Sequence, residues 1–159
     1  MQLELTTWVK NHQSVSVNYG PLTFSLKIKE EYVRKESDKT AVRDSKWQEG
    51  VDKSSWPSWE IHPGSDWNYG LVLDKVNPLK SFKVKFLPWP DSNFPFTLSE
   101  VPVSIEAKAR QIPEWTLDQY KLCGVLMDSP VSSSQPEVSV ELVPMGAARL
   151  RISAFPVIR

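Results

Sequence analysis

Apolar and polar side chains alternate along much of this chain, and no stretch of eleven or more residues has the 3.6-residue period of an amphipathic helix. Alternation with a period of two is typical of antiparallel strands that bury one face and expose the other. It is clearest in residues 15–28, 82–86, 101–109 and 138–152. The 13 prolines, spread along the chain, also argue against long helices. The pattern therefore predicts an all-β fold.

Glycine and proline mark the turns between these segments. Gly20-Pro21 interrupts the first segment and predicts a bend or bulge between two strand segments. Pro144-Met145-Gly146 predicts a hairpin turn that pairs residues 138–142 with residues 148–152. Residues 115–122 are the best helical candidate, and we expect a turn or a single helical turn there.

Repeated short strands with proline-rich loops predict a two-sheet antiparallel β-sandwich, with a jelly roll as the nearest alternative topology. The length of 159 residues suits a single domain spanning residues 1–159. Residues 36–55 are charged and polar and predict a long exposed loop, whereas residues 128–136 form a serine-rich connector. Alternation assigns the following residues to the core: Phe24, Leu26, Phe82, Phe86, Val103, Ile105, Val140 and Leu150.

Composition argues against several classes of partner. The 19 basic residues balance 19 acidic ones without clustering, so we expect no nucleic acid. The chain has one cysteine, Cys123, whose apolar neighbours predict a buried structural thiol, and only His12 and His62 could join it as ligands. We therefore expect no metal and no other cofactor. No apolar run reaches the length of a membrane span, and MQLELTTWVK lacks the pattern of a signal peptide. These features predict a soluble chain with no membrane partner and leave its compartment open.

The most unusual stretch is residues 56–71, which is rich in tryptophan and carries carboxylates and an amide. Aromatic faces beside such polar groups suit sugar rings, whose C–H faces are apolar and whose hydroxyls need hydrogen bonds. The same rings also suit the core or a surface on which another domain rests. The candidates for carbohydrate binding or domain docking are Trp56, Trp59, Glu60, Asp66, Trp67, Asn68 and Tyr69.

This segment holds more large rings than a sandwich core about 10 Å thick requires. We therefore expect at least one ring on the surface, with Trp59 and Trp67 as the exposed members and Glu60, Asp66 and Asn68 as a polar rim. His62 is interpreted as a hydrogen-bonding loop residue. No serine elbow, phosphate-binding glycine loop or defined carboxylate pair is present, so we predict no catalytic residues.

Three segments carry a resemblance to a known family: Asn18–Ile28, Trp67–Leu71 and Leu142–Val157. Together they resemble, in the same order, the C-terminal β-sandwich region of β-L-arabinofuranosidase-like glycoside hydrolases, family 127 and its uncharacterised relatives. In that family an α/α barrel precedes the sandwich and carries a cysteine nucleophile, a cysteine-rich zinc site and nearby glutamates. No motif here matches that apparatus, so Cys123 inherits no catalytic role.

The resemblance implies that this chain is a non-catalytic accessory domain of a larger glycoside hydrolase. Its partner is then the N-terminal catalytic α/α barrel of the parent protein, which the domain supports or contacts. The alternative is a carbohydrate-binding module that uses the aromatic platform between Trp56 and Tyr69. An independent enzyme is the third reading, and it has no activated nucleophile to support it.

Overall fold

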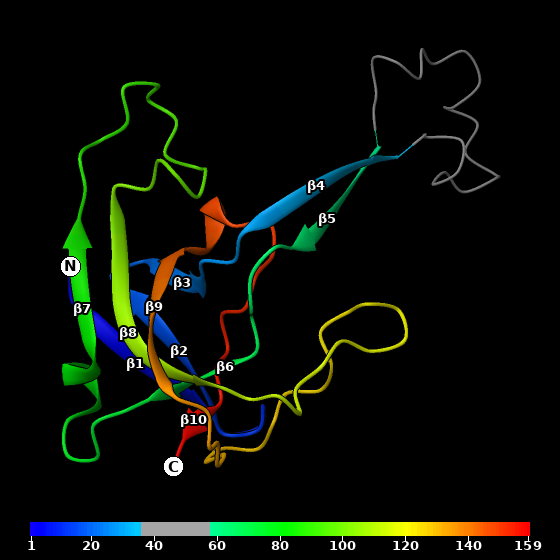
Figure 1. The fold of residues 1–159 in the computed structure, drawn as a ribbon. Coiled ribbons are helices and arrows are strands. Elements are labelled where there is room, and N and C mark those ends of the chain that lie inside the picture. Colours follow the sequence, from blue (N-terminus) through cyan, green and yellow to red (C-terminus); the bar gives the residue numbers. More distant parts are fainter. Residues whose placement is uncertain (36–57) are drawn as a thin grey trace.

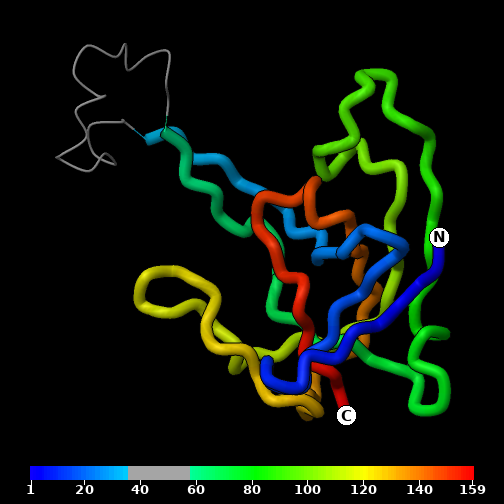
Figure 2. The backbone as a smooth tube through the Cα atoms, turned by 180° about the vertical axis from the view of Figure 1, so that it is seen from behind, coloured from blue at the N-terminus to red at the C-terminus, as the bar shows by residue number. Residues whose placement is uncertain are grey.

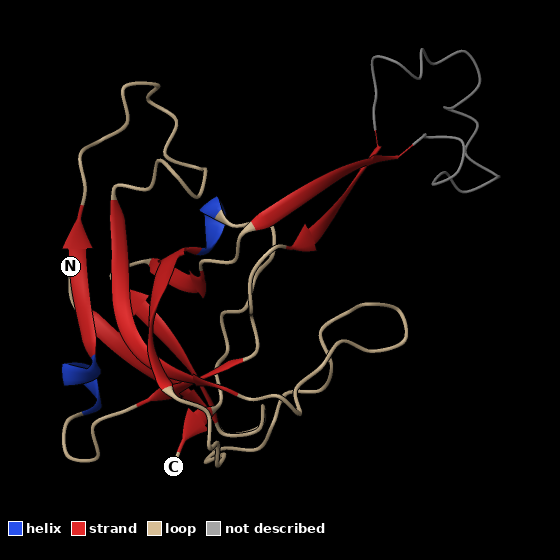
Figure 3. Ribbon diagram, in the orientation of Figure 1, coloured by secondary structure: helices blue, strands red, loops and turns tan. Residues whose placement is uncertain are grey.

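The structure is a computed structural model, which describes residues 1–35 and 58–159. The predicted loop at residues 36–55 and the candidate Trp56 lie outside the described residues. Strands dominate the described part, and the helical elements are two short 3-10 turns, η2 (Pro78–Ser81) and η3 (Met145–Ala147) (Figure 3). Residues 115–122 form a turn closed by a bridge between Leu117 and Cys123.

The described residues contain ten strands. They are β1 (Leu3–Trp8), β2 (Ser14–Tyr19), β3 (Leu22–Leu26), β4 (Glu30–Lys35), β5 (Ser58–Pro63), β6 (Tyr69–Val72), β7 (Phe82–Phe86), β8 (Val103–Gln111), β9 (Glu137–Pro144) and β10 (Val157–Ile158). Eight of them form one sheet in the order β1-β2-β3-β9-β8-β6-β10, with β7 paired to β8 beside β6. The other two, β4 and β5, form a separate antiparallel ribbon.

The sheet curls so that β1 and β2 lie across from β7, β8 and β9 (Figure 1). Alternating residues of both layers meet in one core, with Val17 and Phe24 from the first layer and Ile105 and Leu142 from the second, all fully buried. The all-β, sandwich-like fold predicted from the alternation is confirmed. The two layers are joined by hydrogen bonds through β3 and β9, so they form one continuous sheet.

Residues 152–158, which we call the closing segment, run between β2 and β3 on one side and β6 on the other (Figure 2). The backbone of Phe155 exchanges two hydrogen bonds with Val15, and Leu26 donates to the carbonyl of Ile152. On the other side Leu71 donates to Pro156, and β10 pairs with β6 in parallel. The closing segment thus completes a ring of backbone hydrogen bonds around one end of the core.

This ring explains why the predicted hairpin at residues 144–146 is wrong. Residues 148–152 do not pair with β9, because β8 and β3 already occupy both edges of β9 at Leu142. Pro144 instead leads into η3, and the chain continues toward β3. A central strand has no free edge to offer a hairpin partner.

Gly20-Pro21 forms a tight hairpin turn between β2 and β3, which pair antiparallel at Asn18 and Thr23. Gly20 has a φ of 57°, whereas proline fixes φ near −65°. A positive φ at the first turn residue alone is the requirement of a type II′ turn, which matches the twist of paired strands. The predicted interruption is confirmed, and it reverses the chain direction.

The apolar face of β7 is buried at one end only. Phe82 lies in the core, but Phe86 is exposed, contrary to its assignment to the core. Its ring meets Tyr19 edge to face, with ring centroids 6.0 Å apart. Alternation gives the direction of a side chain on a strand, but it does not say where along the strand the opposite layer ends.

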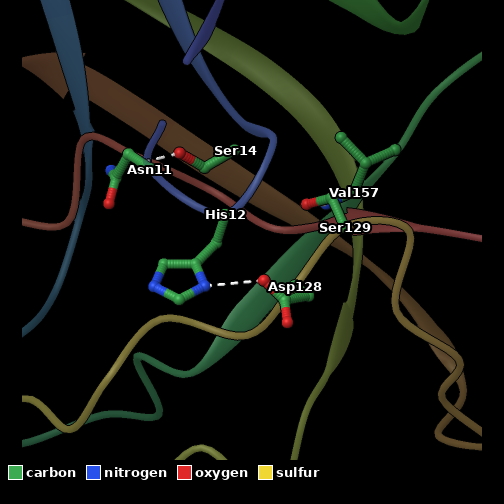
Figure 4. A network of polar contacts seen from close by, with 6 residues as sticks. All are labelled: Asn11, His12, Ser14, Asp128, Ser129 and Val157. Carbon is green, nitrogen blue, oxygen red and sulfur yellow. Dashed lines mark hydrogen bonds and ion pairs between the residues drawn. The ribbon is translucent and has the colours of Figure 1, made fainter. Parts of the chain in front are cut away.

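The serine-rich connector before β9 is anchored to the body (Figure 4). Nδ1 of His12, in the turn after β1, lies 2.7 Å from a carboxylate oxygen of Asp128. The hydroxyl of Ser129 accepts a hydrogen bond from the backbone of Val157, and Val131 bridges to β10. The connector therefore covers one side of the closing segment.

The ribbon formed by β4 and β5 projects away from the sheet (Figure 1). At its base Gly64 donates to the carbonyl of Lys29, and a carboxylate oxygen of Glu30 accepts from the backbone of Arg149. These bonds fix where the ribbon leaves the body. No helix within the described ranges is long and apolar enough to cross a membrane.

Candidate functional site

The predicted site residues divide between two parts of the molecule. Trp59 and Glu60 lie on β5 of the ribbon. Asp66, Trp67, Asn68 and Tyr69 lie where the chain returns to the body and enters β6. The aromatic segment is therefore two sites rather than one platform.

The ribbon has one aromatic face. Its register places Tyr32, Arg34, Trp59 and Ile61 on the same side, because Tyr32 pairs with Ile61 and Arg34 with Trp59. The rings of Tyr32 and Trp59 meet edge to face, with centroids 6.4 Å apart. Both remain largely in solvent, at 52% and 51% exposed. The predicted exposure of Trp59 is thus confirmed.

The other face of the ribbon is charged. A carboxylate oxygen of Glu60 lies 3.3 Å from Nζ of Lys35 and 3.2 Å from Nε2 of His62. Desolvation opposes ionisation of this carboxyl, but its contacts with Lys35 and His62 lower the pKa of Glu60 below its usual value. His62 does make a hydrogen bond, as predicted, although it lies in a strand. Glu60 therefore points away from Trp59 and forms no rim around it.

The end of β7 and the loop between β7 and β8 carry an aromatic cluster that is not among the predicted site residues. Its exposed apolar residues are Phe86 at the end of β7 and, in the loop, Leu87, Trp89, Phe94 and Phe96. Phe94 and Phe96 meet edge to face, with centroids 5.3 Å apart, and the indole N–H of Trp89 donates to Asn93. The signal was present in FLPWPDSNFPF, since closely spaced prolines prevent a strand from carrying these rings into the core.

The ribbon and this loop meet at a hollow of about 580 Å³. Tyr32 lines it from the ribbon, and Phe96 and Leu98 line it from the loop. We call these two lining rings and the exposed rings that contact them the aromatic face: Tyr32 with Trp59, and Phe96 with Phe94. Charged residues also line the hollow, namely Lys27, Lys29, Glu30 and Arg149. Apolar rings beside charged groups are the usual anatomy of a protein interface.

A larger open groove of about 900 Å³ adjoins this hollow. Four stretches line it, which are residues 26–27, residues 63–69, the end of β8 with residues 115–117, and residues 139–141 of β9. Residues 63–69 run from the ribbon down to β6 on the right of the sheet in Figure 1. Lys27 and Ser65 line both the groove and the hollow, so the two are neighbours.

The side chain of Asn68 holds one wall of the groove in place. Its amide N–H groups donate to the carbonyls of Ile112 and Trp115, at 2.9 and 3.1 Å. Its amide oxygen accepts from Nε2 of Gln111, at 3.1 Å. Asn68 is therefore a structural clip between the 63–69 stretch and the end of β8, and not a free polar rim.

Trp67 is half-buried, contrary to its predicted exposure. It packs against two core clusters and meets Trp115 edge to face, with ring centroids 5.1 Å apart. Trp115 is only 2% exposed, and its indole N–H donates to the carbonyl of Gly124. The packing of Trp115 against Trp67 fixes the orientation of the Trp67 ring, which lines the groove.

Charged groups of both signs line the groove. Nζ of Lys27 lies 2.8 Å from a carboxylate oxygen of Glu141. Partial burial opposes ionisation of Glu141, but the contact with Lys27 lowers its pKa below the usual value. Asp66 is exposed at the mouth, and partial burial together with the Asp66 charge raises the pKa of Tyr69. At neutral pH the groove therefore presents two carboxylates, one ammonium and a neutral phenol.

Cys123 is exposed, contrary to the prediction of a buried thiol. It directly follows the turn at residues 115–122 and forms an isolated bridge with Leu117. Even so, partial shielding of the sulfur raises the pKa of the thiol, and the nearby Asp118 charge adds to this effect. Among residues 1–35 and 58–159, no three or more His, Cys, Asp or Glu side chains form a group that could hold a metal ion.

Comparisons of the chain with protein-family models, with curated proteins and with solved structures find no match.

Proposed function

We propose that this chain is a non-catalytic accessory domain of a larger carbohydrate-active enzyme and that it docks on its partner through the aromatic face. The observation that carries the proposal is the exposure of four aromatic rings on two separate elements. Tyr32 and Phe96 line one hollow from its two sides, and Trp59 and Phe94 each meet one of them edge to face. Contiguous apolar surface of this kind on a small domain marks an interaction site. Aromatic residues are also the commonest energetic anchors of such sites.

The form of the ribbon supports docking. A two-stranded ribbon is marginally stable in water unless something packs on it. The charged side of this ribbon is stabilised by the contacts of Glu60 with Lys35 and His62. Its aromatic side has only the single contact between Tyr32 and Trp59 among the described ring pairs. A partner surface over Tyr32 and Trp59 would supply the missing layer.

The resemblance of residues 18–28, 67–71 and 142–157 to the family 127 sandwich region names the partner. It is the catalytic α/α barrel of the parent enzyme. A supporting role also agrees with the chemistry of Cys123, because a thiol with a raised pKa is largely protonated at neutral pH and is a poor nucleophile.

The test begins with the gene. We expect the natural coding region to specify an α/α barrel before this domain. The barrel and the domain are then expressed as separate chains, and their association is measured by calorimetry. Trp59→Ala should weaken association about tenfold or more, as expected for an aromatic anchor. Trp8→Ala is the matched control, since Trp8 on β1 is 50% exposed and lies outside the aromatic face.

Equal association of wild type and Trp59→Ala would contradict docking through the aromatic face. A natural gene without any barrel would contradict the family assignment. Phe96→Ser tests the loop side of the same surface, because Phe96 lies on a different element and is also exposed.

A further inference from the structure

The groove differs from the aromatic face in the way it is built. The rings of the aromatic face are exposed and contact few neighbours, whereas the groove walls are held by buried contacts. Asn68 fixes one wall with three hydrogen bonds, and Trp115 fixes the ring of Trp67. A surface that is ordered before a ligand arrives loses little conformational freedom on binding. The groove therefore has the preorganisation of a binding site.

From this geometry we infer that the groove binds a neutral glycan chain. Its volume of about 900 Å³ is in the range of ligand sites, and it is open to solvent rather than enclosed. An open groove suits a segment of a longer chain that enters at one end and leaves at the other. The lining combines the aromatic residue Trp67 with polar side chains, among them Asp66 and Glu141.

The chemistry of the lining selects sugars. The apolar C–H face of a pyranose or furanose ring packs on an aromatic ring, and Trp67 offers one at the groove wall. Sugar hydroxyls donate hydrogen bonds to carboxylates, and ionised acceptors make the stronger bonds. Glu141 stays ionised because Lys27 lowers its pKa, and Lys27 can donate in turn to a ring or hydroxyl oxygen.

The charge of the groove selects neutral sugars over acidic ones. Asp66 and Glu141 outnumber Lys27, and the ammonium of Lys27 is already paired with Glu141. Among the described residues that line the groove, a uronate or sulfate group would meet the exposed carboxylate of Asp66, and the only cation is Lys27, which is paired with Glu141. The same argument disfavours nucleic acid, whose phosphates need several unpaired basic residues.

The groove also lies beside the proposed docking surface, with Lys27 and Ser65 lining both. A partner docked on the aromatic face would therefore have the glycan chain passing at its edge. This part of the inference rests on the proposed function, whereas glycan binding by the groove does not.

Affinity gel electrophoresis of the 159-residue chain tests the inference with four neutral polysaccharides, which are arabinan, arabinoxylan, galactomannan and dextran, and with acidic polygalacturonate. We expect at least one neutral polymer to retard the chain and polygalacturonate to leave its mobility unchanged. Retardation by none of the four, or stronger retardation by polygalacturonate, overturns the inference.

Two variants locate the site. Asp66→Ala should weaken retardation about tenfold, the effect of losing a charge-assisted hydrogen bond, and it should leave folding intact. Asp66 is exposed and makes no hydrogen bond or ion pair with another described residue. Asp91→Ala is the matched control, an exposed aspartate in the loop between β7 and β8. Unchanged retardation of Asp66→Ala overturns the assignment to the groove.

Trp59→Ala separates this inference from the proposed function. It should bind the polysaccharide like wild type, since Trp59 lies on the ribbon and does not line the groove. Loss of retardation in Trp59→Ala with full retardation in Asp66→Ala would place the sugar on the ribbon and overturn the groove assignment. Failure of barrel association with intact glycan binding would reject only the docking proposal.

Discussion

Trp59 and Trp67 come from the same short aromatic segment, yet they have different surroundings. Trp59 sits on a two-stranded ribbon, touches Tyr32 edge to face and is half exposed. Trp67 sits where the chain rejoins the sheet, packs against two core clusters and leans on the buried Trp115. The polar residues beside these two rings also have different surroundings. Glu60 forms an ion pair with Lys35 on the surface, whereas Asn68 donates hydrogen bonds to two backbone carbonyls of the groove wall.

The number of neighbouring elements therefore decides whether an aromatic side chain is buried or exposed. The ribbon is a two-stranded sheet, and its ring pair is about half exposed. The groove wall lies between β6, β8 and the loop after β8, and each of them supplies a contact. Burial of a large ring stabilises the fold, while exposure of a similar ring leaves surface for a partner.

Trp115→Ala should have the largest effect on stability. Removing a fully buried ring leaves a cavity and removes support from Trp67, so we expect the free energy of unfolding to fall by about 3–5 kcal/mol. Urea denaturation followed by tryptophan fluorescence and by circular dichroism measures this change. If Trp115→Ala lowers the free energy of unfolding no more than Trp59→Ala does, the groove wall is not held more firmly than the ribbon.

Asn68→Ala should have the next largest effect. The substitution leaves two buried carbonyls and the Gln111 amide without their partner, which costs about 2 kcal/mol. Asn68→Asp is the informative second variant, because its carboxylate would face the carbonyl oxygens of Ile112 and Trp115 and should be at least as destabilising. If Asn68→Asp is as stable as wild type, Asn68 is not a clip.

Trp59→Ala should change stability by less than about 1 kcal/mol, the usual value of one exposed aromatic pair. The same denaturation experiment measures it, with Tyr32→Ala as the reciprocal variant. A loss close to that of Trp115→Ala would mean that the ribbon is part of the core structure and would argue against its use as a docking arm.

Removal of the ion pair between Lys27 and Glu141 should have the smallest effect on the free energy of unfolding. The pKa of Glu141 is lowered in the folded state, so its contribution is present above the unfolded value of about 4.3 and is lost as the pH falls through the folded pKa. Because both side chains are more than a third exposed, we expect Glu141→Gln to lose only about 0.5 kcal/mol at pH 7. A difference from wild type that persists unchanged at pH 3 would assign the effect to packing.

The sequence predicted the elements well where burial follows a local pattern. Alternation placed β7, β8 and β9 correctly, and Val103, Ile105 and Val140 are buried as expected. Gly20-Pro21 marked a real change in the backbone because glycine permits the positive φ that the turn needs and proline fixes the φ of the next residue. These predictions succeed because they depend on neighbouring residues only.

Predictions that depended on the opposite layer failed. The burial of Trp67 depends on Trp115 and the exposure of Phe86 depends on where the first layer ends, and neither follows from neighbouring residues. The hairpin at residues 144–146 failed because β3, distant in sequence, occupies the edge of β9. The structural role of Asn68 could not be predicted from the sequence either. Its hydrogen-bond partners lie at and after the end of β8, more than 40 residues along the chain.

The position of the closing segment has a consequence for the order of events in synthesis. β2, β3 and β6 leave the ribosome long before residues 152–158, which supply the backbone partners that join them. Pairing of such distant segments is slow, because the chain must lose loop entropy before the contacts form. We therefore expect a nascent chain stalled before Ile152 to expose Phe24 and Leu71 to chaperones, and the domain to acquire its protease resistance late and in one step.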